Sequence, residues 1–257
     1  MSREPPAKVL RQLRREVGYG CPVEGCRSPY LSWHHFDPPW AEGESHNPEG
    51  MIALCREHHD KADVGAFTNA QLRELKSKYA SAPVSGRFDW MREGPMLVVA
   101  GTTFHLDQMV VLSYRGQPVI WLSRNDDGLL ALNLGMLSQS AEPRLCLREN
   151  FWIAAGEPES FVSPPSGKHI SAKYSNGDFV SITFHNVTWD QAVSRWPKIA
   201  SRAEAWGASF PLTAVEIEFQ IGGVPIGCRS GKPLQIEGAT FDGMTTRSGL
   251  GAAIDLQ

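Results

Sequence analysis

Apolar residues recur at helical spacing in three parts of the chain. Two prolines precede four apolar residues between positions 9 and 17, and this order predicts an amphipathic helix near the start. Two further helices are predicted over residues 68–79 and 188–206, because each begins with a threonine followed three residues later by a glutamine, the spacing of a capping box. Pro197 is expected to kink or split the last of them.

Beyond residue 86 the pattern changes to short runs typical of β-strands. Val215, Ile217 and Phe219 alternate with Glu216 and Glu218, as expected of a half-buried strand. Glycine-containing pairs predict hairpin turns at 115–116, 176–177 and 222–223. The predicted strands cover residues 96–100, 109–114, 119–123, 179–186 and 214–220.

This change of pattern predicts two domains, residues 1–82 and 87–257, joined by the linker SAPVSG at 81–86. The chain has 257 residues, of which 42% are hydrophobic and 21% charged, so wholesale disorder is excluded. The predicted fold class is α+β, with a small N-terminal domain followed by a larger β-rich domain.

The overall charge does not indicate a nucleic-acid-binding protein by itself. The formal net charge is −3 and the isoelectric point is near 6.2, which excludes a basic field over the whole surface. Residues 1–80 carry 11 Lys+Arg and 11 Asp+Glu, so the whole net charge falls on the rest of the chain. A site for a polyanion must therefore be local.

The sequence contains no run of roughly 18 apolar residues, and its first residues lack the apolar region of a secretory signal. We therefore expect a cytoplasmic protein without a membrane partner. In a reducing compartment, five cysteines in a chain of this length are better explained as metal ligands or buried thiols than as disulfides.

Four ligand residues fall in two close pairs within the first domain. Cys21 and Cys26 are separated by four residues, and Cys55 and His58 by two. Zinc prefers four tetrahedral nitrogen and sulfur ligands, and two short turns can supply them. The pattern predicts a structural Zn²⁺ site, and the alternative is a set of unrelated buried thiols.

The segment between the zinc pairs contains WHHFDP and then HNPEGMIALC, and the second pair continues into REHHDKAD. In combination these runs resemble the HNH endonucleases, the ββα-metal nucleases, over about residues 10–80. The resemblance implies a zinc-bound ββα-metal domain that hydrolyses phosphodiester bonds of double-stranded DNA with a divalent cation. It also implies products with 5′-phosphate and 3′-hydroxyl ends.

The resemblance assigns the general base to His35, since a neutral histidine can accept a proton from water near pH 7. It makes His34 and His59 ligands of the catalytic cation, with Asp63 as a third ligand or simply a solvated charge. Where many family members have an aspartate this chain has His34, so Mg²⁺, Mn²⁺, Ni²⁺ and Zn²⁺ all stay open. Asn47 is expected to hold the loop between the two strands by side-chain to backbone bonds, with metal ligation as the minor alternative.

Three basic residues of the same region, Arg27, Arg56 and Lys61, are candidates for phosphate contacts, although surface salt bridges are an equal alternative. His46 does not fit a position of the family pattern and is left out of the expected site.

The second domain shows no nucleotide-binding or hydrolase motif, and its cysteines and histidines lack ligand spacing. We expect it to control activation or targeting, through a small-molecule or protein regulator, DNA binding or homo-oligomer formation. Restriction or defence against phage is the expected context. Two other functions are left open: a zinc-stabilised DNA- or protein-binding module without catalysis, and cleavage of RNA.

Overall fold

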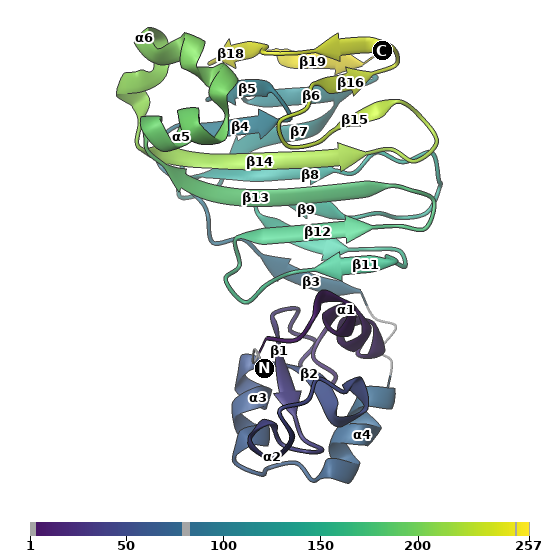
Figure 1. Cartoon of the computed structure of the whole chain (residues 1–257). Helices are drawn as coiled ribbons and strands as arrows, with labels where there is room; N and C mark the ends of the chain where they lie inside the picture. The colour runs from purple at the N-terminus through teal and green to yellow at the C-terminus, as the bar shows by residue number, and fades with distance from the viewer. Residues whose placement is uncertain (1–3, 79–82, 250, 257) are drawn as a thin grey trace. The chain divides into compact units, whose positions relative to one another are not determined.

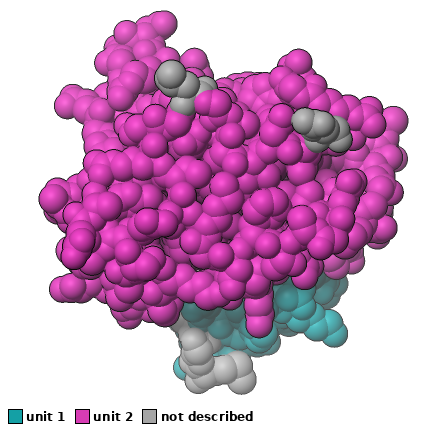
Figure 2. Space-filling view, turned by 90° about the horizontal axis from the view of Figure 1, so that it is seen from above, with its two compact units in different colours: residues 1–86, 160–167 teal, residues 87–159, 168–257 magenta. Residues whose placement is uncertain are grey.

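The computed structural model describes residues 4–78, 83–249 and 251–256. It is a mixed α+β structure that is mostly β, as the sequence predicts at this coarse level (Figure 1). The chain divides into two compact units (Figure 2). The first unit contains residues 1–86 together with 160–167, and the second contains 87–159 and 168–257.

The centre of the first unit is a two-stranded antiparallel sheet followed directly by a helix. Strand β1 (Leu31–His35) pairs with β2 (Met51–Cys55), and α3 (Arg56–Asp63) begins at the next residue. β2 is buried along its whole length, because it packs among the surrounding helices. The other elements of this unit are α1 (Ala7–Glu16), α2 (Trp40–Gly43), η1 (Pro48–Gly50), α4 (Asn69–Ser77) and β11 (Ser160–Val162).

Two of the predicted helices belong to this unit and form for the predicted reasons. In α1, Leu13 lies on the predicted apolar stripe and is fully buried, as is Val17 just after the helix. α4 begins with the predicted capping box, in which Thr68 and Gln71 exchange side-chain to backbone hydrogen bonds. Tyr79, the predicted last residue of this helix, lies outside the described residues.

The predicted linker at 81–86 is wrong in its second half. Val84–Arg87 forms strand β3, in which Val84 is buried, and residues 81 and 82 lie outside the described part of the chain. Pro83 and Gly86 gave the segment a linker composition, but two buried or half-buried side chains are enough to hold a short strand in place.

The second unit contains two sheets. In the first, the strand order is β19-β6-β7-β8-β9-β10. In the second, β12, β13 and β14 lie side by side, and the other edge of β14 pairs first with β4 in parallel and then with β15 (Figure 1). The strands are β4 (Met96–Ala100), β5 (Thr103–Leu106), β6 (Val110–Tyr114), β7 (Gln117–Arg124), β8 (Leu130–Gly135), β9 (Cys146–Arg148), β10 (Phe151–Ala154), β12 (His169–Lys173), β13 (Phe179–Val187), β14 (Leu212–Gln220), β15 (Ile226–Cys228), β16 (Leu234–Ile236), β17 (Ala239–Phe241), β18 (Thr245–Arg247) and β19 (Ala252–Leu256).

All five predicted strands are present, as are the three predicted hairpin turns. The helix predicted over 188–206 is split at Pro197, as expected, into α5 (Trp189–Arg195), η2 (Pro197–Arg202) and α6 (Ala203–Trp206), and η3 (Gly207–Ser209) follows. Trp196 and Trp206 of this helical segment pack in one core cluster with residues of β4, β5 and β14.

Glu216 is buried, although it lies on the polar side of the alternating pattern predicted for this strand. Its side chain accepts hydrogen bonds from Arg195, Trp196 and Ser230. Burial pushes the pKa of Glu216 upward, but hydrogen bonds from His185, Ser230, Arg195 and Trp196 outweigh it and lower that pKa to about 2. Polar and apolar residues do alternate along β14. The helical segment that contains Arg195 and Trp196, however, covers the face that carries Glu216.

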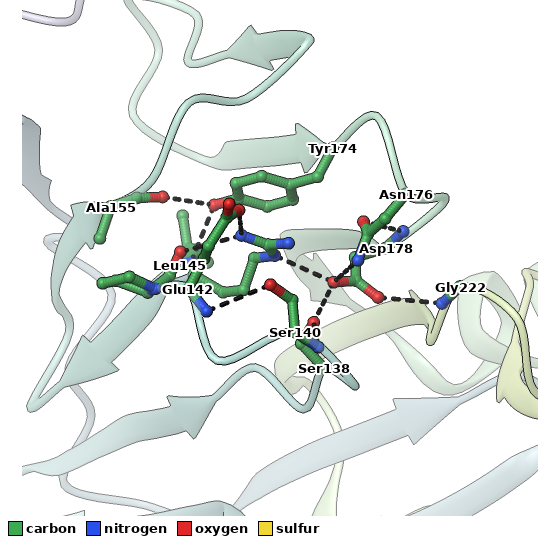
Figure 3. A network of polar contacts seen from close by, with 11 residues as sticks. Ser138, Ser140, Glu142, Leu145, Ala155, Tyr174, Asn176, Asp178 and Gly222 are labelled. Atoms are coloured by element: carbon green, nitrogen blue, oxygen red, sulfur yellow. Dashed lines mark hydrogen bonds and ion pairs between the residues drawn. The ribbon is translucent and has the colours of Figure 1, made fainter.

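A second buried carboxylate, Asp178, connects three loops of this unit (Figure 3). It accepts hydrogen bonds from Asn176, from the backbone of Gly222 and from Arg144, the last at 2.9 Å, and also from the hydroxyl of Ser138. Burial alone would raise the pKa of Asp178, but these donors together hold it below its usual range. Asp178 is therefore ionised, and its hydrogen bonds hold the three loops together.

Among the described residues, no helix combines the length and the apolar character that a membrane crossing requires.

Candidate metal centres

The first cluster joins the two predicted zinc pairs. Cys21 and Cys26 lie in the turn before β1, Cys55 is the last residue of β2, and His58 is on the first turn of α3. Their ligand atoms all lie within 4.8 Å of one another, and the cysteines form no disulfide. This Cys₃His group is the arrangement that the spacing predicts, and it could hold a zinc ion.

Two of the three donor distances given for the Cys₃His group match those of a zinc site. Tetrahedral coordination at about 2.0–2.3 Å places neighbouring sulfur and nitrogen donors roughly 3.5–3.8 Å apart. The Sγ atoms of Cys26 and Cys55 are 3.7 Å apart and Cys21 Sγ lies 3.5 Å from His58 Nδ1, whereas Cys55 Sγ lies closer to His58 Nδ1, at 3.1 Å. Burial raises the pKa of the Cys21 thiol to about 12, which is the opposite of what a nucleophilic cysteine needs. The group therefore has the donor set of a structural site rather than of a reactive cysteine, and it could hold a zinc ion.

A second cluster uses the same strand and helix. His34 of β1 lies with its Nδ1 3.0 Å from Asp63 Oδ1, and Asp63 Oδ2 lies 3.2 Å from His59 Nδ1. The three ligand atoms are within 4.8 Å of one another. His59 and Asp63 are one helical turn apart on α3, and His58 is rotated about 100° from His59. The two clusters are consequently held by different faces of one helix.

The hydrogen bonding of His59 leaves one nitrogen suited to a cation. His59 Nε2 lies 3.2 Å from the carbonyl oxygen of Trp33, which can only accept, so Nε2 carries the proton. In the neutral ring Nδ1 then holds a lone pair. That atom is buried without a hydrogen bond and faces an oxygen of Asp63. His59 Nδ1 and the Asp63 carboxylate are both acceptors, and a cation between them would bind to both. The second ring nitrogen of a metal-binding histidine often donates to a backbone carbonyl, as Nε2 does here to Trp33.

His34 is also suited to bind a cation, because its surroundings favour the neutral ring. Burial lowers the pKa of His34, the neighbouring His59 lowers it further, and Asp63 opposes both effects. The side chain of Asp63 is 53% exposed, so this cluster is open to solvent on the carboxylate side. A ligand that enters from solvent can therefore reach it.

His35 lies next to this cluster but has different neighbours. It is the last residue of β1, and its Nε2 lies 3.3 Å from Nδ1 of His46. A cleft of about 440 Å³ is lined by His34 and His35 together with His59 and Asp63. The structure thus brings four of the predicted residues to one cleft. It also places His46, which fits no position of the family pattern, against His35.

Asn47 makes a local contact. Its side-chain oxygen accepts a hydrogen bond from the backbone of Glu49 and caps the short helix η1. It lines a different cleft, with Glu16 and Lys76 among its neighbours. This contact holds the loop that leads into β2.

The three basic candidates differ in their surroundings. The guanidinium of Arg27 donates to the carbonyls of Val17, Gly18 and Gly20, so its position is structural. Arg56 and Lys61 form exposed salt bridges one helical turn along α3, with Asp60 and Glu57 respectively. Such exposed pairs contribute little to stability because solvent screens them, so a phosphate can replace the carboxylate partner.

Comparison of the chain with protein-family models, with curated proteins and with solved structures gives no match. The geometry of the two clusters is therefore the basis for the function proposed next.

Proposed function

We propose that the first unit is a metal-dependent HNH endonuclease domain that hydrolyses phosphodiester bonds of double-stranded DNA. The observation that supports this most is the second cluster, in which His34, His59 and Asp63 converge within 4.8 Å beside a Cys₃His group. The order of β1, β2 and α3 around these residues is the order expected for a ββα-metal site.

In this proposal His34, His59 and Asp63 hold a divalent cation, with Mg²⁺, Mn²⁺ and Ni²⁺ as candidates. Such a cation neutralises charge on a scissile phosphate. His35 accepts the proton of the attacking water, and the open cleft admits the backbone of DNA. Asn47 keeps the loop in place, while Arg56 and Lys61 exchange their surface partners for phosphates.

The second unit would then control activation or targeting, for example in restriction or defence against phage. Its share of the net charge is acidic, so a regulator other than DNA fits it better than a long DNA-binding face. Formation of a homo-oligomer through the second unit is another way in which it would control the nuclease.

The test is cleavage of supercoiled plasmid by protein that retains zinc but has been freed of weakly bound cations. We expect nicked and linear products after addition of Mg²⁺, Mn²⁺ or Ni²⁺, and a loss of at least about 100-fold in rate for His35→Ala. His169→Ala, a histidine of the second unit, is the matched control and should cleave normally. A duplex RNA of the same length measures preference between the two nucleic acids.

Equal cleavage by wild type and His35→Ala would identify a contaminating nuclease and remove the proposal. One tightly held zinc per chain, DNA binding and no cleavage with any cation would instead support the alternative, a zinc-stabilised binding module.

A further inference from the structure

The loop between β1 and β2 returns His46 to the side of His35. The backbone N–H groups of Phe36 and Asp37 both donate to the carbonyl of Gly50, which closes the loop directly after β1. Gly50 is required at this closure, because a Cβ atom there would lie 1.7 Å from the carbonyl oxygen of Asp37. The loop is therefore pinned at its two ends, and His46 is held inside it.

Trp40 fixes the ring of His46. The two rings are stacked, with centroids 4.8 Å apart and an angle of 26° between their planes. The ring of His35 lies 5.1 Å from that of Trp40 and 5.5 Å from that of His46. The three aromatic side chains thus form one packed group beside the cleft, in which His46 has a defined orientation.

The direction of the 3.3 Å contact between the two histidines decides which nitrogen of His35 carries the lone pair. If His46 Nδ1–H donates to His35 Nε2, the neutral ring of His35 carries its proton on Nδ1. If instead His35 Nε2–H donates to His46 Nδ1, the lone pair of His35 is on Nδ1. A base that acts through Nδ1 requires this second arrangement.

We propose that His46 is a positioning residue for His35. Its Nδ1 accepts a hydrogen bond from His35 Nε2–H, which fixes the tautomer of His35 and directs its Nδ1 to the proton of the attacking water. This inference rests on the proposed nuclease function, and it assigns His46 no contact with the cation or the DNA.

Two substitutions separate the hydrogen bond from the packing. His46→Phe keeps an aromatic ring on Trp40 but has no acceptor, whereas His46→Gln keeps an acceptor. In Mn²⁺-supported plasmid cleavage we expect His46→Phe to lower kcat by about 10- to 100-fold with KM within twofold of wild type. His46→Gln should restore kcat to within about fivefold. Mn²⁺ binding should be equal in all three proteins.

The tautomer of His35 supplies a readout that does not depend on cleavage. In ¹⁵N-labelled protein at pH 8, the ring nitrogen shifts of His35 should show the Nε2–H tautomer in wild type and a mixture in His46→Phe. Wild-type kcat in His46→Phe, or an Nδ1–H tautomer for His35, would overturn the inference. A wild type that shows the expected tautomer but cleaves nothing would contradict the nuclease function instead, and with it the catalytic purpose of the pair.

Discussion

At the scale of single residues, His105 shows how burial makes stability depend on pH. It is fully buried, and its ring nitrogens contact the hydroxyls of Thr103 and Thr246. Thr103 donates its own hydroxyl proton to the carbonyl of Ala100, so it must accept from His105 Nε2–H, and Thr246 donates to Nδ1. Burial lowers the pKa of His105 to about 4.

Because this pKa is depressed, the unfolded chain binds the proton more readily, and stability is lost as the pH falls from about 6.5 to 4. We expect the loss due to His105 to be on the order of 3 kcal/mol in the unfolding free energy of the second unit. Urea unfolding at pH 7 and pH 4.5 measures it, with His105→Gln as the comparison. A pH dependence that is the same in both proteins would contradict this prediction.

The residue scale also shows what the sequence could and could not predict about the site. The structure brings together His34, His59 and Asp63, which the resemblance grouped, because a strand and a helix fix where their side chains point. His46 was missed because its contact with His35 depends on how an irregular loop returns, and the only signal was a histidine at the far end of that loop. The burial of Glu216 was not evident from the pattern of its strand, because it depends on Arg195 and Trp196, which lie 21 and 20 residues earlier in the chain.

At the scale of elements, the turn before β1 and the start of α3 are joined through the Cys₃His group. Structural zinc supplies on the order of 10 kcal/mol to small units, so Cys21→Ser should leave the first unit unfolded. Limited proteolysis and zinc content measure this directly. Cys146→Ser, in the second unit and outside either cluster, is the control and should keep both zinc and protease resistance. A Cys21→Ser protein that resists protease without zinc would show that the metal is not structural.

Elements with a local signal were the ones predicted correctly. The capping boxes at Thr68 and Thr188 and the break at Pro197 depend on residues within one or two turns of each other. Strand β3 was missed because its composition resembles a linker. The parallel pairing of β4 with β14 joins Met96 to Thr213, and no local pattern along the chain reports a contact of that separation.

At the scale of the whole molecule, the first unit is not continuous in sequence. It includes residues 160–167, where Phe161 is buried and packs edge-on against Tyr19 with ring centroids 6.0 Å apart. No sequence pattern separates this segment from the β-rich domain, because it consists of a short strand like its neighbours. A chain cut after residue 86 would lack it.

We therefore expect Phe161→Ala in the full chain to destabilise the first unit by about 3 kcal/mol, as is usual for a buried phenylalanine. Phe151→Ala is the matched control, since Phe151 is 55% exposed, and its effect should stay within about 0.5 kcal/mol. Hydrogen exchange of α1 and β2 measures the local unfolding free energy. Equal protection in the two variants would mean that residues 160–167 do not stabilise this unit.

The central claim is that one small scaffold holds two cations at separate sites, and a metal titration tests it most directly. After prolonged dialysis against EDTA, we expect one retained zinc per chain and one further Mn²⁺ site, detected by electron paramagnetic resonance. His59→Ala should abolish the Mn²⁺ site and keep the zinc. A protein that binds no second cation, or that binds it equally well in His59→Ala, would contradict the account.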